Sequence, residues 1–95
     1  MAAASLPATL TLAQASQTLR ALQAGLDGTA GGGVFEVDAQ AMAEFDTSAL
    51  AVLLEVRRMA QARGLALSVV QAPPKLRQLA QLYGVQELLA LQPSA

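Results

Sequence analysis

The sequence predicts a single α/β domain in which a mainly parallel sheet of about four strands packs against helices. Segments with the composition or alternation of strands follow segments with helical periodicity in regular order along the chain. Connections of this length favour right-handed β-α-β crossovers, which make neighbouring strands parallel. The 95 residues, of which 54% are hydrophobic, are enough to bury one core, so residues 1–95 are expected to form one domain.

The first third of the chain predicts a strand followed by a helix. In residues 8–12 (ATLTL), leucines alternate with threonines as in a half-exposed strand, whereas residues 1–7 are expected to be flexible. Over residues 15–26, apolar side chains recur at steps of four, three and four, which places them on one face of a helix. Asp27-Gly28 is expected to end that helix.

The middle of the chain predicts a loop, a strand and a long helix. Residues 29–33 are rich in glycine and predict a flexible loop, while residues 34–38 (VFEVD) have the β-branched and aromatic composition of a strand. No GK[ST] sequence follows the glycines, so the loop lacks the signature of a phosphate-binding loop. The long helix is expected over residues 47–63, and Gly64 suits a left-handed terminator.

The last third predicts a strand, a helix and a short tail. Residues 65–70 (LALSVV) are mostly apolar, as in a strand that is buried on both faces of a parallel sheet. Pro73-Pro74 ends this strand and can open a helix, because proline suits the first helical position. Tyr83 continues the apolar stripe of that helix and is expected to anchor it to the core. Residues 85–91 are expected to form a last strand or a half-turn.

The composition argues against several classes of function. Only 14% of residues are charged and the formal net charge is -1, so no broad basic field favours a nucleic-acid partner. Lys75 and Arg77 either are solvated or form a small basic edge that contacts a partner.

Without cysteine or histidine, the chain lacks a thiol nucleophile and the usual proton shuttle, and neither a metal nor another cofactor is expected. Asp38, Glu44 and Asp46 lie near one another in sequence, but a carboxylate-pair hydrolase also needs a defined pocket, so no enzyme is expected.

The apolar segments are short. The longest uninterrupted apolar run, residues 49–54, is far shorter than the roughly 20 residues of a transmembrane helix. Residues 1–14 lack the basic start of a secretory signal. A cytoplasmic location is therefore expected.

The junction at residues 44–54 (EFDTSALAVLL) carries the main functional signal. Asp46, Thr47 and Ser48 stand at the start of the long helix, where their side-chain oxygens can accept hydrogen bonds from unpaired backbone N–H groups. Ser48 is expected to act mainly as a helix cap. Asp46 is expected to order the junction or to contact a basic group on a partner.

Two leucines in the long helix have two possible roles. At about 100° per residue, Leu50 and Leu54 point away from the broad apolar face of that helix. If the helix lies in a groove, both leucines are buried. If it does not, they form exposed apolar anchors for a partner, with Arg57 and Arg58 at the rim.

The order of these motifs resembles the STAS domain family over residues 34–89. The motifs that carry the resemblance are DTSAL at a strand-to-helix junction, LALSVV, the proline pair and LRQLAQLYGV. STAS domains include anti-sigma-factor antagonists, domains attached to anion transporters and small subunits of ABC transporters, and the chain is most similar to the small cytoplasmic STAS subunits of the Mla phospholipid-transport system. Family members often have glycine where this chain has Ala49, whose methyl group would leave an entering partner less room.

The resemblance implies an interaction subunit. It would bind and support the ATPase of a phospholipid-transport ABC complex that maintains outer-membrane lipid asymmetry, and would lie in the cytoplasm, associated with the inner membrane through that complex. Thr47 matches the position that is phosphorylated in anti-sigma-factor antagonists. The alternative is therefore an anti-sigma-factor antagonist regulated by phosphorylation at Thr47, where a phosphate would add about two negative charges.

Overall fold

The structure is a computed structural model that describes residues 4–29 and 31–93. The elements follow the order β1 (Ala4–Ser5), β2 (Thr9–Leu10), α1 (Leu12–Asp27), β3 (Val34–Asp38), β4 (Glu44–Phe45), α2 (Thr47–Ala62), β5 (Ala66–Ala72), α3 (Pro74–Leu82), α4 (Gln86–Leu89) and β6 (Leu91–Pro93). Strands β1, β3, β5 and β6 form one sheet in the order β1-β3-β5-β6, and every pair in it is parallel. This confirms the predicted α/β class and the mainly parallel sheet of four strands.

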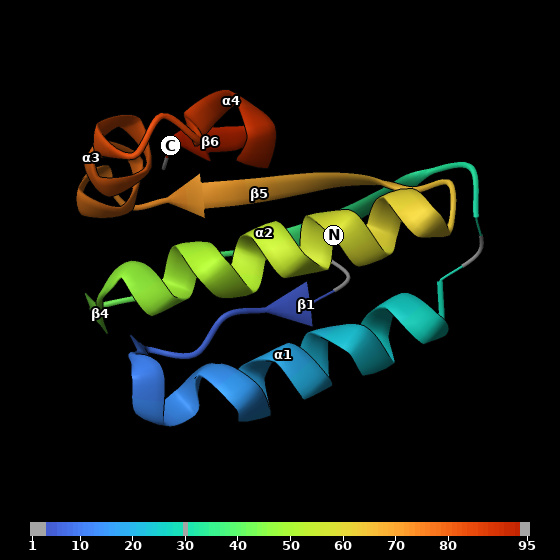
Figure 1. Cartoon of the computed structure of the whole chain (residues 1–95), viewed down its shortest axis with the longest axis horizontal. Helices are drawn as coiled ribbons and strands as arrows, with labels where there is room; N and C mark the ends of the chain where they lie inside the picture. Colours follow the sequence, from blue (N-terminus) through green and yellow to red (C-terminus); the bar gives the residue numbers. More distant parts are fainter. Residues whose placement is uncertain (1–3, 30, 94–95) are drawn as a thin grey trace.

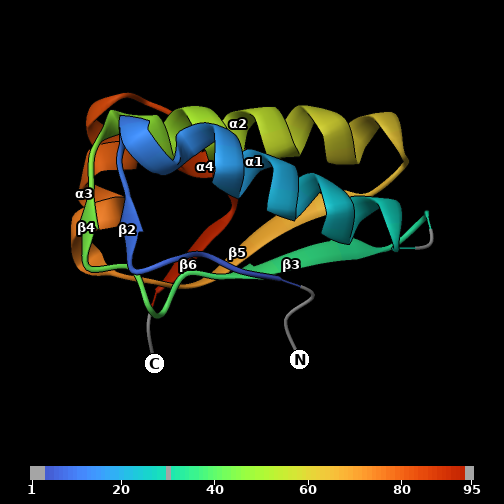
Figure 2. The same ribbon diagram turned by 90° about the horizontal axis from the view of Figure 1, so that it is seen from below.

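The helices lie on one side of this sheet. Helices α1 and α2 run side by side over it, and the opposite face carries no helix among the residues described (Figure 1, Figure 2). Side chains on β3 and β5 alternate accordingly: Phe35 and Leu67 are buried, whereas their neighbours Glu36 and Ser68 are partly exposed. The prediction that residues 65–70 are buried on both faces is wrong, because helices cover one face only.

The start of the chain differs from the prediction. Ala4–Ser5 pairs with β3 as an edge strand, and the next side chain, Leu6, is buried in the core. Residues 4–7 therefore do not form the flexible segment expected for residues 1–7, and residues 1–3 lie outside the described residues. Burial of a single leucine beside a two-residue strand leaves no periodic pattern in the sequence, which is why the prediction missed it.

The predicted strand over residues 8–12 is reduced to β2, and it pairs with β4 instead of joining the main sheet. Helix α1 begins at Leu12, three residues before the predicted start. The backbone N–H of Thr11 donates a hydrogen bond of 2.9 Å to the Gln14 side-chain oxygen, as in a capping box. This local polar contact starts the helix before its apolar stripe begins.

The small β2–β4 sheet positions the two long helices. The parallel register joins Thr9 to Glu44 and Leu10 to Phe45, and each strand leads almost directly into a helix. The N-terminal ends of α1 and α2 consequently lie next to each other at one end of the molecule (Figure 2). Leu10 and Phe45 are both buried there, so the core extends under the two helix starts.

The other boundaries follow local chemistry. Gly64 has φ 71°, as expected of a left-handed terminator after α2, and Pro74 occupies the start of α3. The glycine-rich loop packs against the same terminator: the Gly32 N–H donates to the Gly64 carbonyl at 3.0 Å. A Cβ on Gly31 would lie 2.7 Å from the Arg63 carbonyl oxygen, so this close approach requires glycine. Residues 85–91 form both α4 and the start of β6.

Candidate functional site

The site begins at the N-terminus of α2. Asp46 is the N-cap, and its Oδ1 accepts a hydrogen bond of 2.8 Å from the Ser48 N–H. Thr47 is the first helical residue and its side chain is exposed. The capping role is therefore confirmed for Asp46 and wrong for Ser48, because a helix that begins at Thr47 places Ser48 inside the first turn, where it supplies the N–H. Ala49 is fully buried, so its methyl group packs into the core and does not narrow the exposed surface.

The two leucines that the helix geometry singled out differ from each other. Leu50 is only 4% exposed, so the idea of an exposed anchor is wrong for this residue, whereas Leu54 is partly exposed. Both line a hollow of about 290 Å³ together with Thr47, Ala51, Tyr83 and Val85, which we call the Tyr83 hollow. Leu50 lines the bottom of this hollow, and its side chain is almost inaccessible to solvent. Tyr83 and Val85, from the segment after α3, line the same hollow as Leu50. Sequence periodicity cannot reveal such neighbours.

Two further hollows adjoin the Tyr83 hollow among the described residues. The Lys75 hollow, about 400 Å³, is lined by Phe45, Asp46, Thr47, Lys75, Gln78, Leu79 and Leu82. The Leu12 hollow, about 210 Å³, is lined by Leu12, Ala15, Ser16, Leu19, Ser48, Ala51 and Val52. Thr47 lines both the Lys75 and the Tyr83 hollow, and Ala51 lines both the Tyr83 and the Leu12 hollow. The three hollows therefore form one continuous surface around the first turns of α2, which we call the α2 surface.

Large apolar side chains border the α2 surface. Leu12 is 78% exposed, Leu82 76% and Tyr83 58%, and each lines one of the three hollows. The prediction that Tyr83 anchors α3 to the core is wrong: α3 ends at Leu82, and the buried positions of α3 are Leu76 and Ala80. Exposed apolar side chains gathered around shallow hollows are typical of a protein-binding surface.

Charged side chains lie at both ends of this surface: a paired arginine at one end and a lysine over an aromatic ring at the other. Arg58 donates two hydrogen bonds to Glu55, at 2.8 and 2.6 Å, and these lower the pKa of the Glu55 carboxyl and raise that of Arg58. Arg57 is partly buried one position earlier. At the other end, the Lys75 ammonium lies 5.5 Å from the centroid of the Phe45 ring, a cation–π arrangement. The sequence placed Arg57 and Arg58 beside Leu54 but gave no sign that Lys75 lies next to Thr47.

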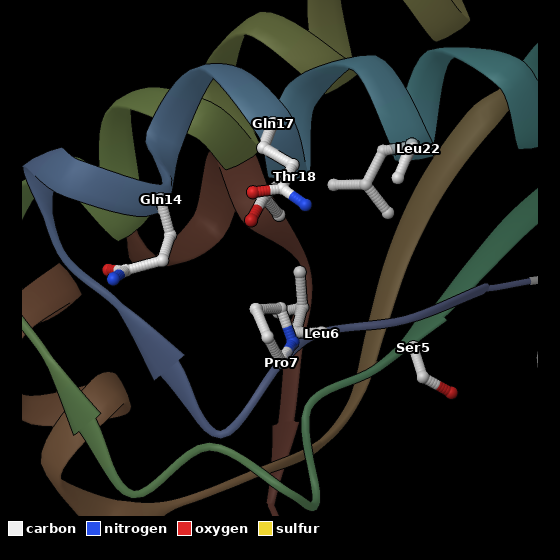
Figure 3. Close-up of a pocket in the computed structure, with 8 residues that line it drawn as sticks. Ser5, Leu6, Pro7, Gln14, Gln17, Thr18 and Leu22 are labelled. Carbon is white, nitrogen blue, oxygen red and sulfur yellow. The ribbon is translucent and has the colours of Figure 1, made fainter.

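Another hollow, of about 410 Å³, lies between α1 and the segment that follows β1. In Figure 3, Gln17 and Thr18 extend from α1 toward Leu6 and Pro7, whereas Gln14 points away from them. None of the side chains that line it is ionisable, and none is among the large apolar side chains that are exposed. It therefore offers less for recognition than the α2 surface.

The carboxylates of the described part of the chain do not gather into a metal-binding cluster. Asp38 Oδ1 accepts the Gln40 N–H at 2.8 Å, while Asp46 caps α2, so these two carboxylates serve separate backbone segments. Across residues 4–29 and 31–93, no three side chains of histidine, cysteine, aspartate or glutamate gather as metal ligands would. Within the same residues, no helix combines the length and apolar character needed to cross a bilayer.

Comparison with known proteins agrees with this fold. A family model described as "Mlab, STAS domain" matches residues 4–91. A solved structure with a similar fold is that of an anti-sigma-factor antagonist (STAS) domain protein from Planctomyces limnophilus. It has a TM-score of 0.79 and 16% sequence identity, and the alignment covers 96% of this chain and 80% of that one. No curated protein matches the chain in sequence.

Proposed function

The chain belongs to the STAS domain family, and on that premise we propose that it binds and stabilises the cytoplasmic ATPase of a bacterial phospholipid-transport ABC complex. STAS domains typically mediate protein–protein interactions and do not catalyse reactions. The subunit would lie in the cytoplasm and reach the inner membrane through the complex, whose transport maintains outer-membrane lipid asymmetry. The description of the matching family model supports the choice of partner.

The observation that carries this proposal is the continuity of the α2 surface. Its three hollows meet at Thr47 and Ala51, two small side chains that allow a partner to approach the helix closely. In the proposed complex, Thr47, Ser48 and Leu54 contact the ATPase directly, and Leu50 supports them from below. Asp46 orders the junction, and Arg57 and Arg58 lie at the rim, where charges affect association rates more than affinity.

Co-purification with the ATPase of the same organism tests the proposal. The native chain should retain the ATPase, whereas Thr47→Glu and Leu54→Asp should each lower the amount retained at least tenfold, because each places a charge in an apolar contact. Circular dichroism should show that both variants remain folded, since neither side chain is fully buried.

Gln23→Glu provides a matched control, because it adds one negative charge at an exposed position of α1 that lines none of the three hollows. This variant should retain as much ATPase as the native chain. A native chain that fails to bind the ATPase would overturn the proposal. If folded Thr47→Glu and Leu54→Asp variants bind the ATPase as well as Gln23→Glu does, the α2 surface is not the binding site.

The exposed hydroxyl of Thr47 favours a second candidate function. Thr47 stands at the N-terminus of α2, where the helix dipole stabilises negative charge, so a phosphate could be accommodated there. An anti-sigma-factor antagonist would use this phosphate to release its partner. Mass spectrometry of the chain after incubation with the serine kinases of its organism distinguishes the two functions. Phosphate on Thr47 together with no ATPase binding would favour the second.

A further inference from the structure

Lys75 is a cation held in place at the edge of the α2 surface. It lies in the first turn of α3, and its ammonium group is 5.5 Å from the centroid of the Phe45 ring. Phe45 itself is buried, which fixes the ring beneath the ammonium group. An ammonium over an aromatic face is attracted by the ring quadrupole, so this contact orients the side chain without neutralising its charge.

No carboxylate of the described residues neutralises Lys75. The ion pairs formed within 4.0 Å by these residues are Arg58 with Glu55 and Arg63 with Asp27. Asp46 lines the same hollow, but its Oδ1 accepts the Ser48 N–H and it forms no ion pair with Lys75. The hollow therefore contains a carboxylate that is hydrogen-bonded to the backbone and an ammonium that forms no ion pair with the described residues.

Apolar side chains lie beside this ammonium. Leu79 and Leu82 line the hollow from the same helix as Lys75, and Leu82 is 76% exposed. A basic segment would be repelled by Lys75, and a neutral polar segment would leave Leu82 without an apolar partner. A segment with a carboxylate next to an apolar side chain satisfies both groups, since close charge pairs at an interface fix its register.

We propose that the partner inserts an acidic, amphipathic segment into the Lys75 hollow, with a carboxylate against Lys75 and an apolar side chain against Leu79 and Leu82. This inference rests on the proposed function, and it specifies which chemistry the bound ATPase presents to this part of the surface. It also makes Lys75 a determinant of specificity, because a partner with a basic segment at this position would be rejected.

Carbodiimide cross-linking of the chain with the ATPase tests the contact directly. The reagent activates a carboxylate, the lysine amine attacks it to form an amide, and the carbodiimide takes up the elements of water and leaves as a urea. Lys75 is the only lysine in the sequence, so peptide mass spectrometry can assign the linked amine without ambiguity. We expect an amide between Lys75 and an aspartate or glutamate of the ATPase.

Binding measurements complete the test. Lys75→Met keeps most of the side chain and removes the charge. It should weaken binding by roughly 10- to 100-fold, the range expected for the loss of a hydrogen bond to a charged group. Lys75→Glu should weaken binding further, and Leu82→Ser should weaken it without removing the cross-link. Arg20→Glu is the matched charge reversal, at an exposed residue of α1 outside the three hollows, and should bind like the native chain.

The outcomes separate this inference from the function on which it rests. A native chain that does not bind the ATPase overturns both. A native complex in which Lys75 forms no cross-link, and in which Lys75→Met and Lys75→Glu bind like Arg20→Glu, overturns the acidic segment alone. If only Leu82→Ser weakens binding, the acidic segment is likewise overturned, because this result indicates an apolar contact without a carboxylate.

Discussion

The two halves of helix α2 bury the same kind of core face but present different surfaces to solvent. Val52 and Leu53 in the first half and Val56 and Ala60 in the second are all buried. On the outward side, the first half presents the hydroxyl of Thr47 beside apolar hollows, whereas the second half presents charged side chains.

The charges of the second half are largely satisfied within the chain. Glu55 pairs with Arg58 on the same helix, and Arg63, just beyond its end, pairs with Asp27 at the end of α1. The first half has no equivalent pairing among the described residues, and Leu12, Leu82 and Tyr83 are exposed around it. The contrast teaches that one amphipathic helix can have most of its charges paired within the chain at one end and be surrounded by exposed apolar side chains suited to a partner at the other.

The largest expected effect concerns the lining of the hollow beside the first half. Leu50→Ala should lower the free energy of unfolding by about 2–5 kcal/mol, because it opens a cavity at a buried position. Leu54→Ala should cost clearly less, since Leu54 is already partly exposed. Urea unfolding of the two variants measures the difference. Equal losses would contradict the distinction between a buried lining residue and an exposed contact.

The next effect concerns binding and leaves folding nearly unchanged. Tyr83→Ala should weaken ATPase binding by about 2 kcal/mol, roughly 30-fold, as expected when a large aromatic side chain of an interface is truncated. Val34→Ala is the control, because Val34 is also 58% exposed but lies on β3, away from the α2 surface. Isothermal titration calorimetry compares the two variants. Similar affinities would show that exposure alone does not identify the interface.

A smaller effect is expected at the start of α2. Asp46→Ala removes the acceptor of the Ser48 N–H and should lower the free energy of unfolding by about 1 kcal/mol. Asp46→Asn should keep most of that stability, since asparagine is an equally good N-cap. Thermal unfolding followed by circular dichroism measures both. A loss as large for asparagine as for alanine would indicate that the carboxylate charge matters more than the hydrogen bond.

The smallest effect concerns the second half of α2. The hydrogen bond from Arg58 lowers the pKa of Glu55 in the folded chain below its ordinary value of 4.5. Between the folded and the unfolded pKa, the unfolded chain binds more protons than the folded chain, so the free energy of unfolding rises with pH. The contribution of Glu55 is therefore complete above its unfolded pKa and is lost as the pH falls through the folded value. Melting temperatures of the native chain and of Glu55→Gln should differ slightly at neutral pH and converge on acidification. A difference that does not depend on pH would contradict this origin.

Local sequence chemistry determined much of the fold. Gly64 predicted the end of α2 because few other residues adopt a positive φ without strain, and the Pro73-Pro74 pair predicted the start of α3 because proline lacks an N–H that the first turn does not need. The composition of residues 34–38 predicted β3 correctly. The sequence also identified the junction at Asp46 and Thr47, since the capping chemistry is contained within three neighbouring residues.

Tertiary structure decided which side chains reach the surface. Helical periodicity gives the direction of Leu50 and Tyr83 but not what packs against them. The sequence therefore left open whether Leu50 is buried, and it wrongly predicted that Tyr83 packs into the core. Pairing of β2 with β4, 35 residues apart in register, brings the starts of α1 and α2 together. The contact between Lys75 and Phe45 likewise joins segments 30 positions apart. Such contacts depend on the placement of whole elements, and that placement is set by the buried core and is not encoded in any one segment.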